Sequence, residues 1–383
     1  MKRILYTTVL LISLFSVQQL MAQGCVAIRG TACSVSCGDE NTLAKGEFQV
    51  GSGLRYFKSF RHFRGTTEEA NRVEQGTEVI NHSYFLDLSI NYGITNRLYA
   101  NAVIPFVHHT RSSMYEHGGN PPNGLGERHE TSSKGLADAR LGLGFWLFKP
   151  KADNYFNYAV GIGVKLPTGK ADYTDIFYNQ GPNKDQDVAG VVDQSIQPGD
   201  GGTGIALDVQ GYHIICKWLT LTTNLYYMIS PRETNGVKTR GGNGEFSCPD
   251  QYAVRLGGYF SVPVKGLSAY LGGRMEGIPS SDLIGGSAGF RRPGYAVSVE
   301  PGLIYTFRHF TFNANVPVAV KRARVQSYDD KQRTASTGVF TQGDAAFADY
   351  LLSFGVAYRF GGKHNMASPA VPAWKNVEPA KGH

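Results

Sequence analysis

The amino-acid sequence predicts an all-β fold: a closed, antiparallel transmembrane β-barrel of about twelve strands. Three observations carry this prediction. Apolar and polar residues alternate along many segments, the connections between those segments alternate between short and long, and the polar face of several segments carries charged residues. Because charged groups cannot face a dry core without partners, we expect lipid on one side of this wall and water on the other.

The alternation is clearest in two neighbouring segments, residues 139–147 and 157–166. In the first, Leu141, Leu143 and Phe145 share one face, whereas Arg140 shares the other with small residues. The second repeats the pattern, with Lys165 on its polar face. A period of two indicates strands, and the short polar connection predicts that the two strands pair as a hairpin.

The chain begins with a predicted signal peptide, residues 1–22, in which Lys2 and Arg3 precede an apolar run. Two processing sites stay open: ordinary cleavage before Gln23, which we favour, or a lipoprotein-type cleavage that leaves Cys25 acylated. No later window holds the roughly 18 apolar residues that a membrane-spanning helix needs. Strands that alternate lipid-facing and lumen-facing residues average out to such mild hydropathy.

Residues 46–360 are predicted to form the barrel. We expect strands at Glu47–Lys58, Val79–Ile94, Leu98–His108, Asp138–Phe148, Phe156–Pro167, Gly204–Ile215, Trp218–Ile229, Tyr252–Val262, Leu267–Glu276, Tyr295–Phe307, Phe310–Val320 and Tyr350–Phe360. The short connections are residues 92–97, 149–154, 216–217, 263–266 and 308–309. In outer-membrane barrels short turns face the periplasm and long loops face outside, so we expect both chain ends in the periplasm.

The last predicted strand ends on Phe360 after alternating aromatic residues. This ending resembles the C-terminal signal recognised by the barrel assembly machinery, which we therefore expect as a partner, together with outer-membrane lipid. Residues 361–383 are rich in Pro, Ala and Lys and have no period, which predicts a flexible periplasmic tail.

Charged residues on the predicted inner face are the candidate pore-lining residues. They are Arg55, Asp87, Arg140, Lys165, Asp208, Arg255, Arg274, Glu276, Glu300 and Arg359. Two interpretations stay open. They can line a pathway whose mixed charges select small-molecule solutes, or they can pair with each other and hold a plugged barrel together.

Residues 23–45 form a cysteine-containing leader, long enough to fold back and plug the lumen partially. Deleting residues 26–44 should then raise single-channel conductance. An oxidising periplasm favours disulfides. Our first expectation is Cys33 with Cys37, and the second is a leader cysteine, Cys25 included, with Cys216; Cys248 should lie beyond reach at the opposite barrel end.

The sequence offers no catalytic, cofactor or metal site that we predict. Four histidines lie at the outer end of the third predicted strand and in the loop after it (His108, His109, His117 and His129), and six aspartates lie in a later long connection (Asp172, Asp175, Asp185, Asp187, Asp193 and Asp200); both groups lack the spacing of known metal motifs. Ser287 lies in a literal nucleophile-elbow pattern, but the context is a loop between strands rather than a strand–turn–helix. The formal charge of +7 comes without a basic stripe interleaved with aromatic residues, so we expect no nucleic-acid partner.

Three local patterns resemble one known family. They are Gly135-Leu136-Ala137-Asp138, Leu166-Pro167-Thr168-Gly169-Lys170 and Gln197-Pro198-Gly199-Asp200-Gly201. Together they resemble the outer-membrane transporter family linked to the phenol meta-cleavage pathway. The resemblance implies an outer-membrane barrel that moves aromatic or other hydrophobic compounds.

We therefore expect a monomeric, non-enzymatic outer-membrane barrel that passes small solutes passively or through a gate. The alternative is a structural, ligand-binding or adhesive surface barrel with a blocked lumen, in which the long loops carry the function.

Overall fold

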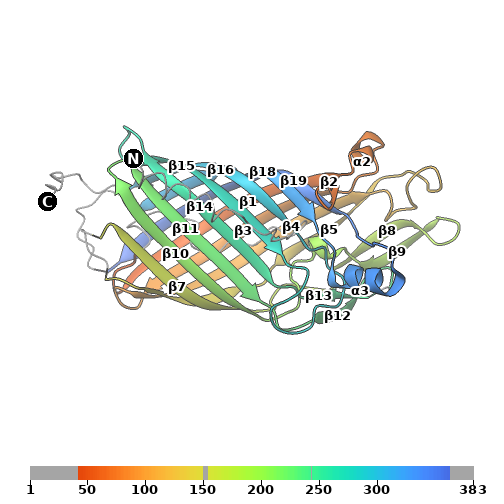
Figure 1. Ribbon diagram of the computed structural model, residues 1–383, viewed down its shortest axis with the longest axis horizontal. Coiled ribbons are helices and arrows are strands. Elements are labelled where there is room, and N and C mark those ends of the chain that lie inside the picture. Colours follow the sequence, from red (N-terminus) through yellow and green to blue (C-terminus); the bar gives the residue numbers. More distant parts are fainter. Residues whose placement is uncertain (1–41, 150–153, 243, 363–383) are drawn as a thin grey trace, which may run out of the picture.

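The computed structural model describes residues 42–149, 154–242 and 244–362, and these residues form a closed antiparallel barrel of twelve strand positions. The wall strands are β1 (Glu47–Arg64), β3 (Ile80–Gly93), β4 (Leu98–Ser113), β6 (Arg140–Trp146), β7 (Phe156–Lys165), β10 (Gly204–Cys216), β11 (Leu219–Ile229), β14 (Gln251–Ser261), β15 (Leu267–Ile278), β16 (Gly294–Phe307), β17 (Phe310–Asn315), β18 (Val318–Arg324) and β19 (Ala345–Gly361). Figure 1 shows these strands tilted around one long cylinder.

Each wall strand pairs with its neighbour in sequence, and the first strand pairs with the last. The closing pair, β1 with β19, runs from Glu47 opposite Gly361 to Phe63 opposite Ala345. Full closure leaves no unpaired strand edge, as a barrel in lipid requires. The predicted fold class is therefore confirmed.

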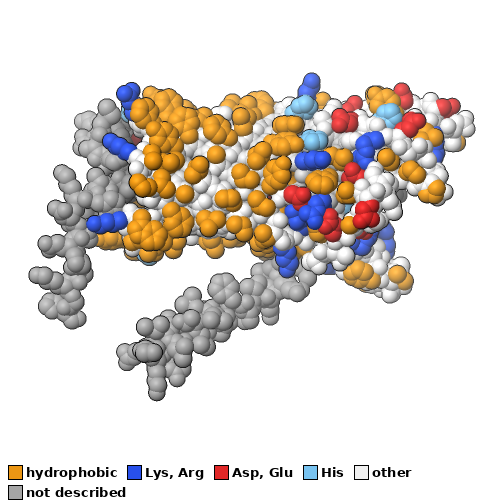
Figure 2. All heavy atoms as spheres, turned by 90° about the horizontal axis from the view of Figure 1, so that it is seen from above, with side chains coloured by type: hydrophobic (Ala, Val, Ile, Leu, Met, Phe, Trp, Pro, Cys, Tyr) orange, Lys and Arg blue, Asp and Glu red, His pale blue; other side chains and the backbone are white. Residues whose placement is uncertain are grey.

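The two faces of the wall differ as the alternation predicts. Outward residues such as Leu141, Ile162 and Leu303 are about half exposed, at 48%, 56% and 53%, whereas inward Trp146 is 1% exposed. Figure 2 shows apolar side chains spread over most of the wall, with charged side chains gathered toward one end. Apolar side chains outside and polar ones inside are typical of a barrel that spans a membrane.

The two ends of the barrel differ in their connections. At the short-turn end, β10 and β11 are joined by two residues, and β16 and β17 by two. At the long-loop end, the connections contain further elements (Figure 1): β2 (Thr67–Glu68), α2 (Asn71–Glu74), β5 (His129–Leu136), β8 (Thr174–Gln180), β9 (Gln186–Val191), η3 (Gln194–Ile196), β12 (Thr234–Lys238), β13 (Glu245–Ser247) and α3 (Tyr328–Thr337). None of the described helices is long and apolar enough to cross a membrane.

Three details differ from the sequence prediction. β1, β4, β18 and β19 extend beyond the predicted strands at the long-loop end, because their outer parts find partners there: β1 pairs with β19, β4 with β5, and β18 with the start of β16. The predicted strand Phe310–Val320 is broken into β17 and β18 at Val316 and Pro317, since proline has no N–H to donate to the ladder. β5 itself was not predicted. It continues the pairing of β4 where β6 ends.

The predicted signal peptide, the leader up to residue 41 and the tail from residue 363 lie outside the described residues. The end of the leader, from Thr42, packs at the short-turn end. There Leu43 is buried, and the backbone N–H of Lys45 donates to Asn96 Oδ1 at 2.9 Å.

Candidate functional site: the barrel lumen

One charged cluster in the lumen comes from β14, β15 and β16. Arg255 Nε lies 2.8 Å from Glu300 Oε2, and Arg274 pairs with Glu276 two residues further along its own strand. Asn315 donates to the other oxygen of Glu300 at 3.0 Å. Four of the ten predicted pore-lining residues therefore pair within one cluster.

A second pair links β1 to β3. Arg55 Nη2 lies 2.9 Å from Asp87 Oδ2, and the Arg55 guanidinium stacks 4.6 Å from the ring centre of Phe85. Near the short-turn end, Arg359 Nε donates to Gln49 at 2.9 Å. Asp208 lies against Gly161, and no ion-pair partner for its carboxylate occurs among the described residues.

The remaining two predicted residues, Arg140 and Lys165, lie opposite each other at the long-loop ends of β6 and β7. The Arg140 guanidinium lies 5.8 Å from the ring centre of Tyr226. Lys165 is 2% exposed and contacts two carboxylates, Asp200 directly and Asp138 at 3.8 Å. Sequence reasoning missed both carboxylates as lumen residues.

Asp138 belongs to the first of the three family-like motifs and Asp200 to the third. All three motifs meet at one point of the wall. Asp138 accepts hydrogen bonds from the backbone N–H of Gly169 at 3.0 Å and of Asp200 at 3.1 Å. Thr168 donates to the Ala137 carbonyl at 2.7 Å. A Cβ on Gly199 would lie 2.5 Å from Asp138 Oδ1, so only glycine fits there. We call this junction the motif knot.

In the short-turn half of the lumen, side chains of the wall pack against each other. Tyr99, Trp146 and Tyr212 are buried in one cluster, and Gln210 donates to Tyr99 Oη at 2.6 Å. The ring of Tyr99 lies over Gly144, its partner residue on β6. A Cβ at residue 144 would come within 2.1 Å of that ring. Aromatic rings therefore occupy part of this half.

The long-loop half of the lumen holds a cavity. Apolar groups of Phe57, Phe85, Phe246 and Ile278 line it. Polar groups line it too: Ser83, His109, Asp138, Arg140, Lys165, Gln194, Ser195, Gln197, Asp200, Asn235 and Gln251. This mixture of apolar walls and a few polar groups is typical of small-molecule sites.

Residues 192–197, in the connection between β7 and β10, contribute three of the lining residues; we call them the lid segment. Val192 and Ile196 are fully buried, and Ser133 of β5 donates to the Ile196 carbonyl. Asp193 caps η3 by accepting from Ser195 N–H at 2.9 Å. The lid segment of this long connection therefore folds inward.

Asp193 anchors the lid segment to β4 and to the segment before β16. Arg292, before β16, donates to both carboxylate oxygens at 2.7 and 2.6 Å, and Arg111 of β4 lies 3.7 Å away. Burial alone would raise the pKa of Asp193, but the two guanidinium groups outweigh it and hold the pKa well below its usual range.

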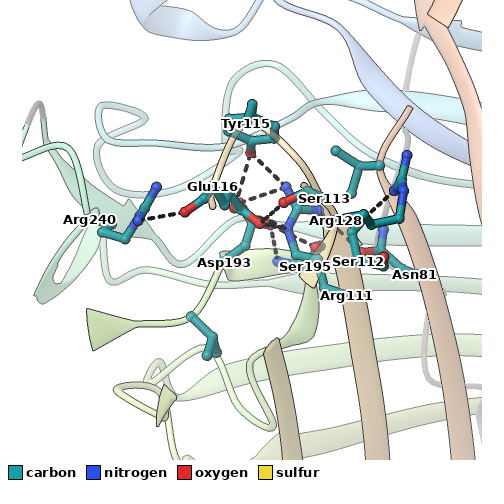
Figure 3. A network of polar contacts seen from close by, with 12 residues as sticks. Asn81, Arg111, Ser112, Ser113, Tyr115, Glu116, Arg128, Asp193, Ser195 and Arg240 are labelled. Atoms are coloured by element: carbon teal, nitrogen blue, oxygen red, sulfur yellow. Dashed lines mark hydrogen bonds and ion pairs between the residues drawn. The ribbon is translucent and has the colours of Figure 1, made fainter. Parts of the chain in front are cut away.

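Figure 3 shows the network around Arg111. Its guanidinium also binds Glu116 at 3.0 Å and Asn81 at 3.1 Å, and Arg240 reaches the Glu116 carbonyl at 3.1 Å (Figure 3). Five separate segments of the chain therefore meet where the lid segment is anchored.

Several of these aspartates and histidines have partners within the chain. Asp193 and Asp200 pair with cations of the chain, and Asp175 accepts from Ser132 N–H at 2.6 Å. His117 Nδ1 accepts from Tyr178 N–H at 3.0 Å, and burial lowers the pKa of His117 to about 4. Among the described residues, no group of three or more candidate ligands could hold a metal ion.

The cysteine and serine candidates are placed as follows. Cys216 ends β10 at the short-turn end, whereas Cys248 lies near the motif knot and donates to the Asp200 carbonyl at 3.2 Å. Cys25, Cys33 and Cys37 lie outside the described residues, so the disulfide pairing stays a prediction. Ser287 lies in the loop between β15 and β16, where its hydroxyl accepts from Asp282 N–H at 2.8 Å.

Comparisons with known proteins agree with the architecture. No family model and no curated protein matches the sequence. The solved structure of the COG4313 outer membrane channel from Pseudomonas putida F1 is similar, with a TM-score of 0.57, 11% identity, and coverage of 85% of this chain and 100% of that one.

Two further solved structures match more loosely. The toluene transporter TodX of P. putida has a TM-score of 0.39 and 10% identity, covering 84% of this chain and 92% of that one. A Pseudomonas aeruginosa FadL homologue has a TM-score of 0.40 and 7% identity, and the match covers 82% of this chain and 90% of that one. At 11% identity the likeness to the COG4313 channel shows a shared barrel fold and nothing more.

Proposed function

We propose that this chain is an outer-membrane channel for small uncharged solutes, apolar or aromatic ones included. The observation that carries the proposal is the cavity under the lid segment, which combines aromatic walls with polar groups. Because most charges near it are paired within the chain, they offer little attraction to a free ion. In this proposal the long loops face outside and both chain ends face the periplasm.

The resemblance to the transporter family of the phenol meta-cleavage pathway forms the finer part of the proposal. The motif knot supports it, because Asp138, Gly199 and Asp200 line the cavity instead of merely shaping turns. The COG4313 channel from P. putida supports the barrel architecture only.

Liposome swelling tests passage directly. The purified mature chain in liposomes should let arabinose, a small neutral solute, enter faster than empty liposomes allow, and faster than gluconate of similar size. Cells that produce the chain should also take up radiolabelled toluene faster than cells without it. Equal rates in both assays would reject the channel.

Charge selection has its own test. Arg140→Glu combined with Arg274→Glu should shift the reversal potential toward cations in planar bilayers, because both side chains line the lumen. Lys170→Glu with Lys184→Glu, both in the outer loops, is the matched control and should leave it unchanged. Unaltered selectivity in the lumen variant would contradict the proposed route.

The alternative is a surface barrel with a blocked lumen and functional loops. The buried lid segment and the packed short-turn half favour it specifically. It predicts no solute flux in the wild type and none after the lid segment is released.

A further inference from the structure

Four neighbouring strands carry outward-facing basic and aromatic residues near the long-loop end. We call Tyr56, Lys58, His82, Tyr84, His108 and Lys134 the basic patch. Strand register places them in two rows. Tyr56, Tyr84, His108 and Lys134 lie side by side across β1, β3, β4 and β5, and Lys58 lies beside His82 in the next row.

The patch faces away from the lumen. Its members alternate with buried Phe57, Phe85 and Val107, and Tyr84 is 48% exposed. Tyr56 Oη lies 2.9 Å from His82 Nδ1, and the rings of Tyr56 and Tyr84 are 4.8 Å apart. The aromatic rings therefore support each other and hold polar groups in place on the outer wall.

The position of the patch along the wall matches the edge of the lipid layer. Directly below the first row, Leu54, Leu86, Phe106 and Leu136 form the last apolar row. At the other edge Phe48 stacks on Phe360 at 5.4 Å. Phe48 and Tyr56 are eight residues apart on one strand. With a strand tilt of about 40°, this separation spans about 21 Å along the barrel axis, close to the roughly 25 Å height of an apolar belt.

The charges of the patch have one sign. Thr110 and Ser132 complete the second row, and neither row contains a carboxylate. Neither Lys58 nor Lys134 forms an ion pair with a described residue; Lys58 Nζ lies 4.7 Å over the ring of Phe60. The carboxylate of Asp175, from the loop strand β8, is bound by the N–H and hydroxyl of Ser132 at the end of the second row. Figure 2 shows histidine and basic side chains at the border of the apolar belt.

We propose that the basic patch binds the phosphate of a lipid in the outer leaflet, a phosphorylated glucosamine lipid of the lipid A type. Lysine ammonium groups bind phosphate as point charges, and the tyrosine hydroxyls and imidazoles supply further hydrogen bonds. The acyl chains of the same lipid lie along the apolar row below. The site depends on how the barrel is placed in the membrane and does not depend on solute passage.

Native mass spectrometry of the full mature chain tests the site, with lipid A and enzymatically dephosphorylated lipid A as probes. The wild type should retain lipid A and bind the dephosphorylated form at least tenfold more weakly. Lys58→Gln with Lys134→Gln should lower lipid A binding by roughly tenfold or more, since each basic residue near a lipid surface adds to binding.

Lys265→Gln with Arg308→Gln, at the short-turn end, is the matched control and should bind lipid A like the wild type. Binding is counted per folded barrel, identified by its heat-dependent gel migration, so a variant that folds less still gives a result. Equal binding by the Lys58 and Lys134 variant, or equal binding of the dephosphorylated lipid, would overturn the site. Solute flux would be unaffected by either result.

Discussion

The two halves of the lumen are built in different ways. In the short-turn half, wall side chains such as Tyr99, Trp146 and Tyr212 pack against each other. In the long-loop half, the lid segment comes from a connection of nearly 40 residues and closes a cavity that the wall leaves open. The first half is a consequence of strand alternation, whereas the second depends on contacts between segments far apart in sequence.

This difference decides where a gate can lie. Packed wall residues are held on both sides by the sheet and can move little. The lid segment is held mainly by Asp193, its cap and a few hydrogen bonds. We therefore expect changes at the lid anchor to alter flux most, and changes in the wall to alter stability more than flux.

The largest expected effect is on solute flux. Asp193→Asn removes the charge that binds Arg111 and Arg292, and breaking a buried pair costs roughly 3 kcal/mol or more. The lid segment should then leave its closed position, and arabinose swelling should rise several-fold. Asp187→Asn, in the same connection but exposed, is the control. An unchanged rate in the Asp193 variant would show that the lid segment does not limit passage.

The next effect is on the motif knot. Lys165→Met leaves Asp138 and Asp200 close together without their shared cation, so we expect a loss of about 3 kcal/mol in the free energy of unfolding. Urea unfolding in detergent measures it. Lys170→Met is the matched control because Lys170 is largely exposed. Similar unfolding curves for both variants would remove the knot as a stabilising element.

A smaller effect is expected in the packed half. Gly144→Ala places a Cβ within 2.1 Å of the Tyr99 ring, whereas a Cβ at Gly53 has nothing within 4 Å. Gly144→Ala should therefore destabilise by about 1–3 kcal/mol as Tyr99 shifts and its bond with Gln210 weakens. Gly53→Ala should be close to neutral. If urea unfolding shows the same loss of unfolding free energy for both variants, close packing against Tyr99 does not explain the effect of Gly144→Ala.

The smallest effect depends on pH. Because burial lowers the pKa of His117 to about 4, its neutral form is favoured in the folded loops. Its contribution to stability is complete above the unfolded pKa of about 6.5 and is lost as pH falls from there toward 4. The melting temperature should fall over that range, and His117→Gln should weaken the decline. His213 lies exposed on the outer wall, so His213→Gln should leave the decline of the melting temperature unchanged.

How far the sequence predicts each half follows from the same physics. Period-two alternation identified the wall strands and placed Arg55, Asp87 and Glu300 on one side, because side-chain direction in a strand is a local property. It did not predict that Lys165 pairs with Asp200, 35 residues away, or that Asp193 contacts Arg292, 99 residues away. Such pairs depend on how loops fold over the barrel.

One signal in the sequence did point to the missed residues. The three motifs containing Asp138, Gly169 and Asp200 stood out by their resemblance to one family, and in the structure they form one junction. Each motif alone predicts only a local turn. Their meeting shows why a glycine at 199 and an aspartate at 138 are both needed: the carboxylate occupies the space that a side chain at 199 would fill.

The central claim is that solutes cross the membrane through this barrel when the lid segment is released. Single-channel recording in planar bilayers of the purified mature wild type and of Asp193→Asn measures it most directly. We predict discrete conductance steps that are larger or longer-lived in the Asp193→Asn variant. The absence of conductance steps from both proteins, although both insert as folded barrels, would contradict the claim.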